Sequence, residues 1–169
     1  MGVATLISLD EYLATSYRPD CDFIDGEVLE RNVGKKKHAY AQSAIVLWLG
    51  RNTDMSRVHP FTEARMRVSR TRVRIPDVIL VERPFPDEEV FTAAPYLCIE
   101  VLSPDDTTRT MQARLDDYLD IGVPNIWVVD PWSHRGWRIT ATSWEPASDG
   151  ILRTSDGKIQ MPLAEVLLA

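Results

Sequence analysis

The segment from residue 95 to residue 130 constrains the fold most, because two continuous apolar runs enclose one well-marked helix. "YLCIEVLS" and "NIWVVDP" have the unbroken hydrophobic character of strands that are buried on both faces. Between them, "PDDTTRTMQARLDDYLDIGVP" starts with acids and threonines, carries one apolar stripe and places Gly122 where a helix would stop. Strand 95–102, helix 107–121 and strand 125–130 therefore predict a right-handed parallel βαβ unit.

Turn and capping signals divide the preceding part of the chain. "SLDEY" predicts a helix that begins at Ser8, and "CDFIDGEVLER" predicts a hairpin with its turn at Asp25-Gly26. Helical spacing of apolar residues predicts a helix over 37–51 on the sheet. "TEARMRVSRTRVRIPDVILVE" predicts a second hairpin about a polar Ser-Arg-Thr turn, and its second arm continues as a strand over 72–81.

The remaining segments complete one unit. "RPFPDEEVFTAAP" has no periodicity and predicts a loop, "HRGWRITATSW" predicts an edge strand, and "PLAEVLLA" predicts a short terminal helix. No internal repeat or linker divides the sequence. We expect a single α/β domain over 1–169, with a mixed β-sheet flanked by helices and the βαβ unit at 95–130.

Composition limits the class of protein. Of the 169 residues, 44% are hydrophobic and 26% are charged, which is typical of a soluble globular protein. No apolar run reaches the roughly 18 residues of a membrane span, so we expect a cytoplasmic protein that does not associate with membranes. Cys21 and Cys98 are expected to be reduced packing residues. The formal net charge of −6 argues against a protein that coats nucleic acid through bulk electrostatics.

Two carboxylates stand among aliphatic residues that should exclude charge. Asp77 lies in "RVRIPDVILV" and Glu100 lies in "PYLCIEVLSP". A buried carboxylate costs several kcal/mol or more unless it is protonated, paired with a cation or bound to a metal. A divalent cation would remove both penalties and the repulsion between the two groups, and Mg²⁺ or Mn²⁺ prefers such oxygen ligands. Alternatively, Pro76 places Asp77 at a strand end, and Glu100 pairs with an arginine.

An inward-facing arginine is expected beside these acids. Arg114 falls between Met111, Leu115 and Tyr118 on the apolar stripe of helix 107–121, so its guanidinium should be directed toward the sheet. Such a cation would complement the two carboxylates. The alternative is an arginine that lays its methylene groups on the core and reaches water at the edge.

Basic residues also line the second hairpin. Arg65, Arg67, Arg72 and Arg74 are spaced mostly by two, which would align several guanidinium groups for contacts with a nucleic acid backbone. An equally plain interpretation is a solvated edge strand that charge protects from aggregation. Lys36, in "GKKKH", could also grip a backbone, although loop solubility explains these lysines as well.

At these residues the chain resembles the PD-(D/E)XK nuclease superfamily, specifically a large bacterial family of restriction endonuclease-like proteins. The resemblance runs through "SLDEYL", "DFIDGEV", "RIPDVILV", "IEVLSPDD" and "DDYLDIGVPNIWVVDP", and it implies a restriction endonuclease-like core. It also implies a divalent-metal site and supporting residues around it. The implied metal ligands are Asp77, Glu100, the carbonyl of Val101, and Asp22; the implied neighbours are Glu27, His38 and Tyr118.

The family's lysine is replaced in this chain. Leu102 follows Glu100 by two residues, and the cation that the family supplies from the next helix corresponds to Arg114. Arginine keeps the charge and can clamp a phosphate, but it does not give up its proton.

The resemblance implies hydrolysis of DNA phosphodiester bonds with Mg²⁺ or Mn²⁺, in which Arg114 would stabilise the transition state. A nuclease-fold module that binds DNA without cleaving it, and a hydrolase of small phosphoesters, stay open as alternatives. We expect a homodimer, because two-fold symmetry suits the cutting of both strands, and "WSHRGWRI" could form an exposed edge for it.

Overall fold

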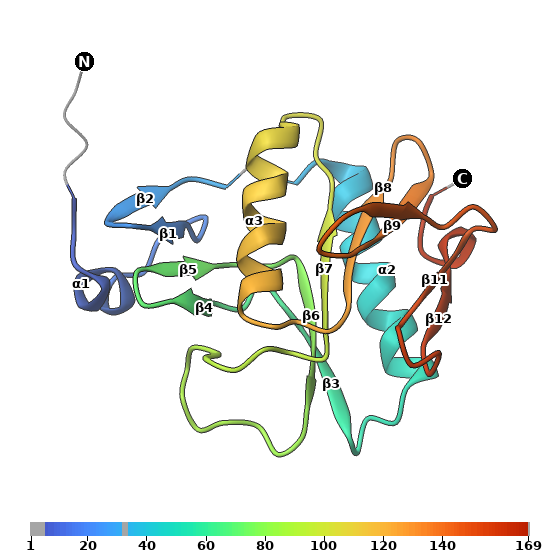
Figure 1. Cartoon of the computed structure of the whole chain (residues 1–169), viewed down its shortest axis with the longest axis horizontal. Coiled ribbons are helices and arrows are strands. Elements are labelled where there is room, and N and C mark those ends of the chain that lie inside the picture. The colour runs from blue at the N-terminus through green and yellow to red at the C-terminus, as the bar shows by residue number, and fades with distance from the viewer. Residues whose placement is uncertain (1–5, 32–33, 169) are drawn as a thin grey trace.

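A six-stranded mixed sheet organises the protein, which is described here as a computed structural model over residues 6–31 and 34–168 (Figure 1). The strand order is β10-β9-β8-β7-β6-β3. These strands are β3 (Val58–Thr62), β6 (Val78–Glu82), β7 (Leu97–Val101), β8 (Ile126–Asp130), β9 (Arg135–Ile139) and β10 (Trp144–Pro146). β7 and β8 are parallel, and the other neighbouring strands are antiparallel, so the predicted mixed sheet is confirmed.

The βαβ unit forms as predicted, with α3 (Thr108–Asp120) between β7 and β8. Thr107 caps the start of α3 by accepting a hydrogen bond from the Thr110 N–H, and the Thr110 side chain bonds back to complete a capping box. At the other end, Gly122 has a φ of 89°, and the N–H groups of Gly122 and Val123 donate to carbonyls of the last turn. This Schellman-type ending requires a left-handed residue, which is why glycine stops the helix there.

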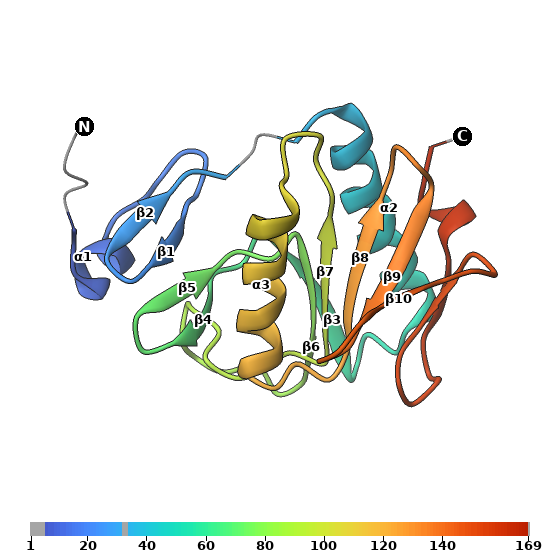
Figure 2. The ribbon, with the colours of Figure 1, turned by 45° about the horizontal axis from the view of Figure 1, so that its top comes forward.

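A second sheet of four strands packs beside α3, in the order β2-β1-β5-β4 (Figure 2). Its members are β1 (Asp22–Ile24), β2 (Glu27–Leu29), β4 (Met66–Ser69) and β5 (Arg72–Arg74), and the short helix α1 (Leu9–Ala14) lies against them. Both predicted hairpins are present. Asp25 and Gly26 have φ values of 52° and 98°, as a tight two-residue hairpin turn requires.

The strand predicted over 72–81 is wrong as a continuous element. It divides into β5 and β6, which belong to different sheets, and residues 75–77 connect them. Pro76 lacks an N–H and disfavours a regular ladder at its own position, so the chain leaves one sheet and enters the next here. Asp77 therefore lies immediately before β6 rather than inside a strand.

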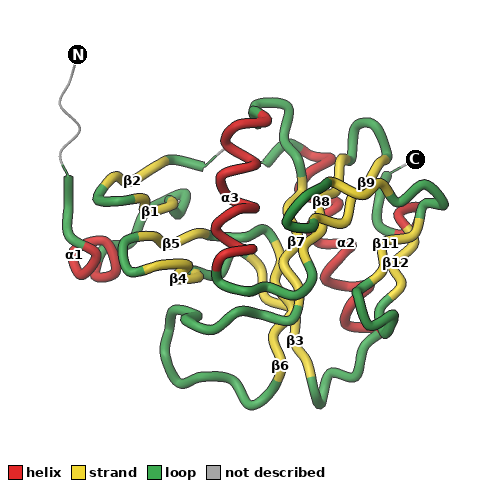
Figure 3. Tube along the Cα trace, in the orientation of Figure 1, coloured by secondary structure: helices red, strands yellow, loops and turns green. Residues whose placement is uncertain are grey.

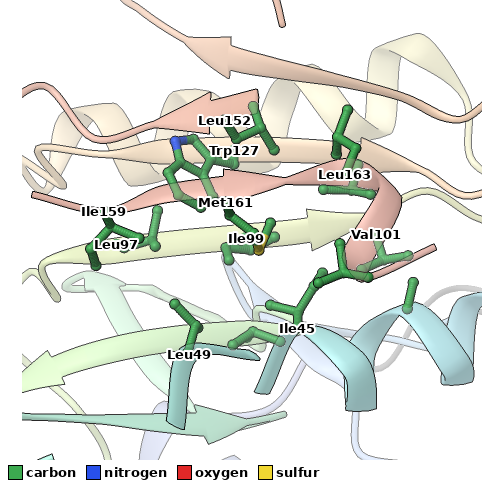
Figure 4. Packing of buried hydrophobic residues seen from close by; sticks show 14 of the residues in the cluster. Ile45, Leu49, Leu97, Ile99, Val101, Trp127, Leu152, Ile159, Met161 and Leu163 are labelled. Atoms are coloured by element: carbon green, nitrogen blue, oxygen red, sulfur yellow. The ribbon is translucent and has the colours of Figure 1, made fainter. Parts of the chain in front are cut away.

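Helices cover both faces of the six-stranded sheet: α2 (Lys36–Asn52) lies behind it in Figure 1 and α3 lies in front. On the α2 face, Ile45 and Leu49 pack with Ile99 and Trp127 in a cluster that also includes the C-terminal hairpin β11 (Ile151–Arg153) and β12 (Gln160–Pro162) (Figure 4). On the α3 face, Met111 and other apolar helix residues pack on alternate strand residues. The alternation of side chains along β7 therefore assigns Glu100 to the α3 face.

One further expectation is corrected. β9 is not an edge strand, because β8 and β10 pair with its two sides, so β10 forms that edge of the sheet. The predicted short terminal helix is present as one 3₁₀ turn, η1 (Leu163–Glu165). The segment between β6 and β7 is a long loop, as predicted (Figure 3). Within the described ranges, no helix has the length and apolar character needed to cross a membrane.

Candidate active site

The structure brings Asp77 and Glu100 together at the end of the β6–β7 ladder. Val78 pairs with Ile99 in this antiparallel ladder, so the next step of the register places Asp77 opposite Glu100. The two residues are 3% and 1% exposed. At this proximity the negative charge of Asp77 raises the pKa of Glu100.

Asp77 accepts hydrogen bonds at both carboxylate oxygens. Its Oδ1 lies 2.9 Å from Nη2 of Arg31, and its Oδ2 lies 2.8 Å from the N–H nitrogen of Val101 and 3.3 Å from Nε2 of His38. Burial alone would raise the pKa of Asp77, but the His38 hydrogen bond and the charges of His38 and Arg31 lower it below its usual range. These contacts therefore favour the ionised form of Asp77.

Glu100 has the opposite electrostatic character. Burial, and then the negative charge of Asp77, raise its pKa to about 7, although Arg114 partly offsets this. Its Oε1 accepts a hydrogen bond of 2.5 Å from the Tyr118 hydroxyl, and its Oε2 lies 3.5 Å from Nη1 of Arg114. The pair thus contains one carboxylate that ionises readily and one that ionises only near neutral pH.

Arg114 points inward from α3, as its position on the apolar stripe predicts. Besides Glu100, its guanidinium contacts Asp22 at 3.7 Å and Asp106 at 4.0 Å, and its side chain is 16% exposed. Burial acts to lower the pKa of Arg114, but the surrounding carboxylates raise it overall. The arginine therefore provides a permanent positive charge beside Glu100.

The expectation that Asp22 would share a metal with Asp77 and Glu100 is not met in this conformation. Its Oδ1 accepts the Ile75 N–H at 3.1 Å, and its Oδ2 lies 2.9 Å from Nη1 of Arg74. Within residues 6–31 and 34–168, no three His, Cys, Asp or Glu side chains are arranged to hold a metal ion together. Asp22 instead links Arg74 to Arg114.

The remaining donors fit a small divalent cation. Asp77 and Glu100 supply hard carboxylate oxygens from opposed positions, and the main chain of Val101 is held beside them by its hydrogen bond to Asp77. A cleft of about 10 Å³ opens beside Asp77 and Val101, and Glu100 lies behind its lining. Its lining consists of Arg31, His38, Asp77, Val101, Ser103, Asp106 and Arg114. The cleft has room for about one ion or water molecule.

Two of the expected neighbours occupy the site and one does not. His38, from the first turn of α2, contacts Asp77, and Tyr118, from α3, contacts Glu100. Glu27 is exposed at the turn end of the β1–β2 hairpin, where it pairs with Ile24, so its predicted place near the metal is wrong. Glu27 lies at the turn end of the β1–β2 ladder, whereas Asp22 pairs with Leu29 at the opposite end of that ladder.

The arginine strip is mostly engaged within the chain. Its contacts are Asp20 for Arg65, the carbonyls of Ser69 and Arg70 for Arg67, Asp25 and Asp117 for Arg72, and Asp22 and Asp117 for Arg74. Arg74 is only 6% exposed, so the structure does not present it to a DNA backbone as expected. Lys36 begins α2 and is exposed near His38.

Sequence reasoning missed Arg31. It lies in "ERNVG", between β2 and α2, where no periodic pattern or motif distinguishes it. Only the contact with Asp77, across 46 positions of the sequence, identifies it as part of the site.

Comparisons with known proteins agree with this fold. A family model described as "Uma2: Putative restriction endonuclease" matches residues 9–152. The fold is also similar to a solved structure titled as a putative nuclease belonging to DUF820 from Anabaena variabilis ATCC 29413. That similarity has a TM-score of 0.82 and 21% sequence identity, and it covers 95% of this chain and 97% of the other. A search of curated proteins gave no match.

Proposed function

The chain belongs to the Uma2 family and has the restriction endonuclease-like fold, and on that premise we propose that it is a metal-dependent endonuclease that hydrolyses DNA phosphodiester bonds. One observation carries the proposal most directly. Asp77 and Glu100 are buried and opposed at the end of two paired strands, and Arg114 stands beside them. A pair of like charges in so dry a place is suited to binding a divalent cation.

Asp77 and Glu100 would hold Mg²⁺ or Mn²⁺, with the carbonyl of Val101 as a further ligand. The bound ion would supply the charge withdrawal and the acidified water that phosphodiester hydrolysis needs. The Tyr118 hydroxyl and the Arg114 guanidinium fix the two oxygens of Glu100, so this ligand is oriented before the metal arrives.

Arg114 would bind the scissile phosphate and stabilise the negative charge of the transition state. Since an arginine stays protonated, it acts here by charge and hydrogen bonding and not by proton transfer. Asp22 is a positioning residue in this proposal, because it lies 3.7 Å from Nε of Arg114 and directs that side chain. We also propose a homodimer, since two-fold symmetry would place one site on each DNA strand.

Plasmid nicking tests the proposal. Wild-type protein should nick supercoiled DNA with Mg²⁺ or Mn²⁺ and not with EDTA, and Asp77→Ala should lower the rate by at least about a hundredfold because a metal ligand is lost. Asp149→Ala, at an exposed turn before β11, serves as the matched control and should cleave like wild type. Cleavage that persists in Asp77→Ala would refute the assignment.

The presence of arginine at position 114 favours a second candidate, a nuclease-fold module that binds DNA without cutting it. Arg114→Lys separates the two. If the wild-type protein does not cleave and the lysine variant does, the arginine has disabled a catalyst. If neither form cleaves and both bind DNA with a steep salt dependence, the binding module is correct.

A further inference from the structure

We propose that Arg31 is a second phosphate-binding residue, which the metal-free protein holds on Asp77 and which a divalent cation releases. This inference rests on the proposed function and assigns a role to a residue that its sequence context does not single out. It makes the binding of metal and of a phosphodiester cooperative.

Arg31 is held by an ion pair with Asp77. Nη2 of Arg31 lies 2.9 Å from Oδ1 of Asp77, and the side chain is 12% exposed. The other oxygen of Asp77 is engaged by the Val101 N–H and by His38. Arg31 therefore occupies the oxygen of Asp77 that has no other hydrogen-bond partner among the described residues.

A divalent cation and Arg31 compete for Asp77. A metal bound at Asp77 must use carboxylate lone pairs; Arg31 engages one lone pair of Oδ1, and the Val101 N–H and His38 engage Oδ2. A bound ion would also place two positive charges close to the guanidinium, which already experiences repulsion from Arg114. Metal binding should therefore weaken the Arg31–Asp77 ion pair.

The released guanidinium would remain next to the site. Arg31 lines the small cleft that contains Arg114, and it also lines a neighbouring cleft of about 220 Å³ that His38, Gln42 and Glu63 border on the α2 side. Asp77 lies in both clefts. A modest rotation of the Arg31 side chain can thus leave Asp77 without taking the cation away from the metal.

Charge balance then favours a phosphate. Two guanidinium groups, Arg31 and Arg114, face the carboxylates Asp77, Glu100 and Asp106. Adding a divalent cation would make the summed charge of these groups positive, and a phosphodiester would supply a compensating negative charge. The planar guanidinium suits bidentate contact with phosphate oxygens.

If the Arg31–Asp77 ion pair were purely structural, removing Arg31 would change the metal affinity in the opposite direction. If Arg31 only kept Asp77 in place, its removal would misplace a metal ligand and weaken metal binding. If Arg31 is a competitor that later binds phosphate, its removal strengthens metal binding and weakens DNA binding. The two affinities must therefore change in opposite directions.

The test uses calorimetric titration with Mn²⁺ and anisotropy of a short fluorescent DNA duplex with Ca²⁺, on folded full-length variants. In Arg31→Gln the dissociation constant for Mn²⁺ should fall about five- to tenfold, because a nearby cation is lost. Its dissociation constant for DNA should rise about tenfold, and the metal should no longer enhance DNA binding. Arg31→Lys keeps the charge and should show smaller changes of the same signs.

Arg51→Gln, on the exposed last turn of α2, is the charge-matched control and should leave both constants unchanged. Weaker or unchanged Mn²⁺ binding in folded Arg31→Gln would overturn the inference, whether or not wild type cleaves DNA. Opposite shifts without any cleavage by wild type would instead support Arg31 and refute the proposed hydrolysis. A wild-type protein that binds no divalent ion would overturn both.

Discussion

At the scale of single residues, the site is defined by two neighbouring carboxylates with unlike ionisation. Asp77 has three hydrogen-bond donors and a lowered pKa, whereas burial and the negative charge of Asp77 raise the pKa of Glu100 to about 7. Because the folded protein favours the protonated form of Glu100, this residue opposes folding once it must ionise. His38, whose pKa is raised by Asp77 despite burial, acts in the same direction, because its stabilising charge is lost as pH rises.

The unfolding free energy of the metal-free protein should therefore fall as pH rises from about 4.5 through about 7. The difference between these two values corresponds to roughly 3 kcal/mol as an upper bound for Glu100. Glu100→Gln should remove most of this slope, because glutamine carries no titrating group. Urea unfolding at several pH values, with EDTA present, measures this pH dependence of the unfolding free energy.

Glu82→Gln provides the matched comparison, since Glu82 is the exposed last residue of neighbouring strand β6. It should leave the pH slope as in wild type. An unaltered slope in Glu100→Gln would show that Glu100 titrates normally and would remove the electrostatic reason for a metal at this position.

At the scale of elements, a buried ion-pair network joins the four-stranded sheet to α3. Arg74 of β5 contacts Asp117 of α3 at 2.7 Å and Asp22 of β1 at 2.9 Å, and all three residues are buried. Asp22 in turn contacts Arg114. The N-terminal sheet therefore positions the face of α3 that carries Arg114 through charge as well as through packing.

Arg74→Met should reduce the unfolding free energy by at most about 3–5 kcal/mol, because it removes the cation that two buried carboxylates share, while Asp117 keeps Arg72 and Asp22 keeps Arg114. Arg153→Met, which removes an exposed ion pair with Asp149 on the C-terminal hairpin, should have little effect. Chemical denaturation of both variants compares them directly. Equal losses in the two variants would contradict a special role for the network.

At the scale of the whole molecule, the distribution of free positive charge differs from the arginine strip that the sequence suggests. The net charge is −6, and internal contacts engage most strip arginines. Lys36 and Lys37 lie instead in the first turn of α2, beside His38 of the site, and Lys36 is exposed. We expect this end of α2 to contact the DNA backbone next to the cleft.

The double substitution Lys36→Gln with Lys37→Gln should weaken DNA binding and lower the slope of log K against log salt by about 2, close to 0.9 for each lost phosphate contact. Lys158→Gln is the control, because Lys158 lines a cleft with Asn52 and Thr53 at the other end of α2. Fluorescence anisotropy of labelled DNA across a salt series measures the affinity and its salt dependence for both variants. A slope that the double substitution does not change would place the DNA elsewhere.

Local patterns explain why much of the fold could be predicted. The capping residues of α3 and the Asp25-Gly26 turn act over a few residues, so the sequence alone determined the βαβ unit and the hairpins. Helix spacing left two directions open for Arg114, and the structure has the inward one. The restriction endonuclease-like fold, implied by the ordered motifs, is confirmed by the family match and the structural comparison. The catalytic and metal-binding roles remain predictions.

Tertiary structure decided which charges meet. At Pro76 the chain passes from one sheet to the other. Two ion pairs, Asp22 with Arg74 and Arg31 with Asp77, connect residues that are distant in sequence. Periodicity predicts which side of an element is buried, but it does not predict which charged side chain of another element will contact that side. A buried charge must find a partner, and only the packed chain determines whether that partner is a metal ligand, a phosphate or an arginine within the protein.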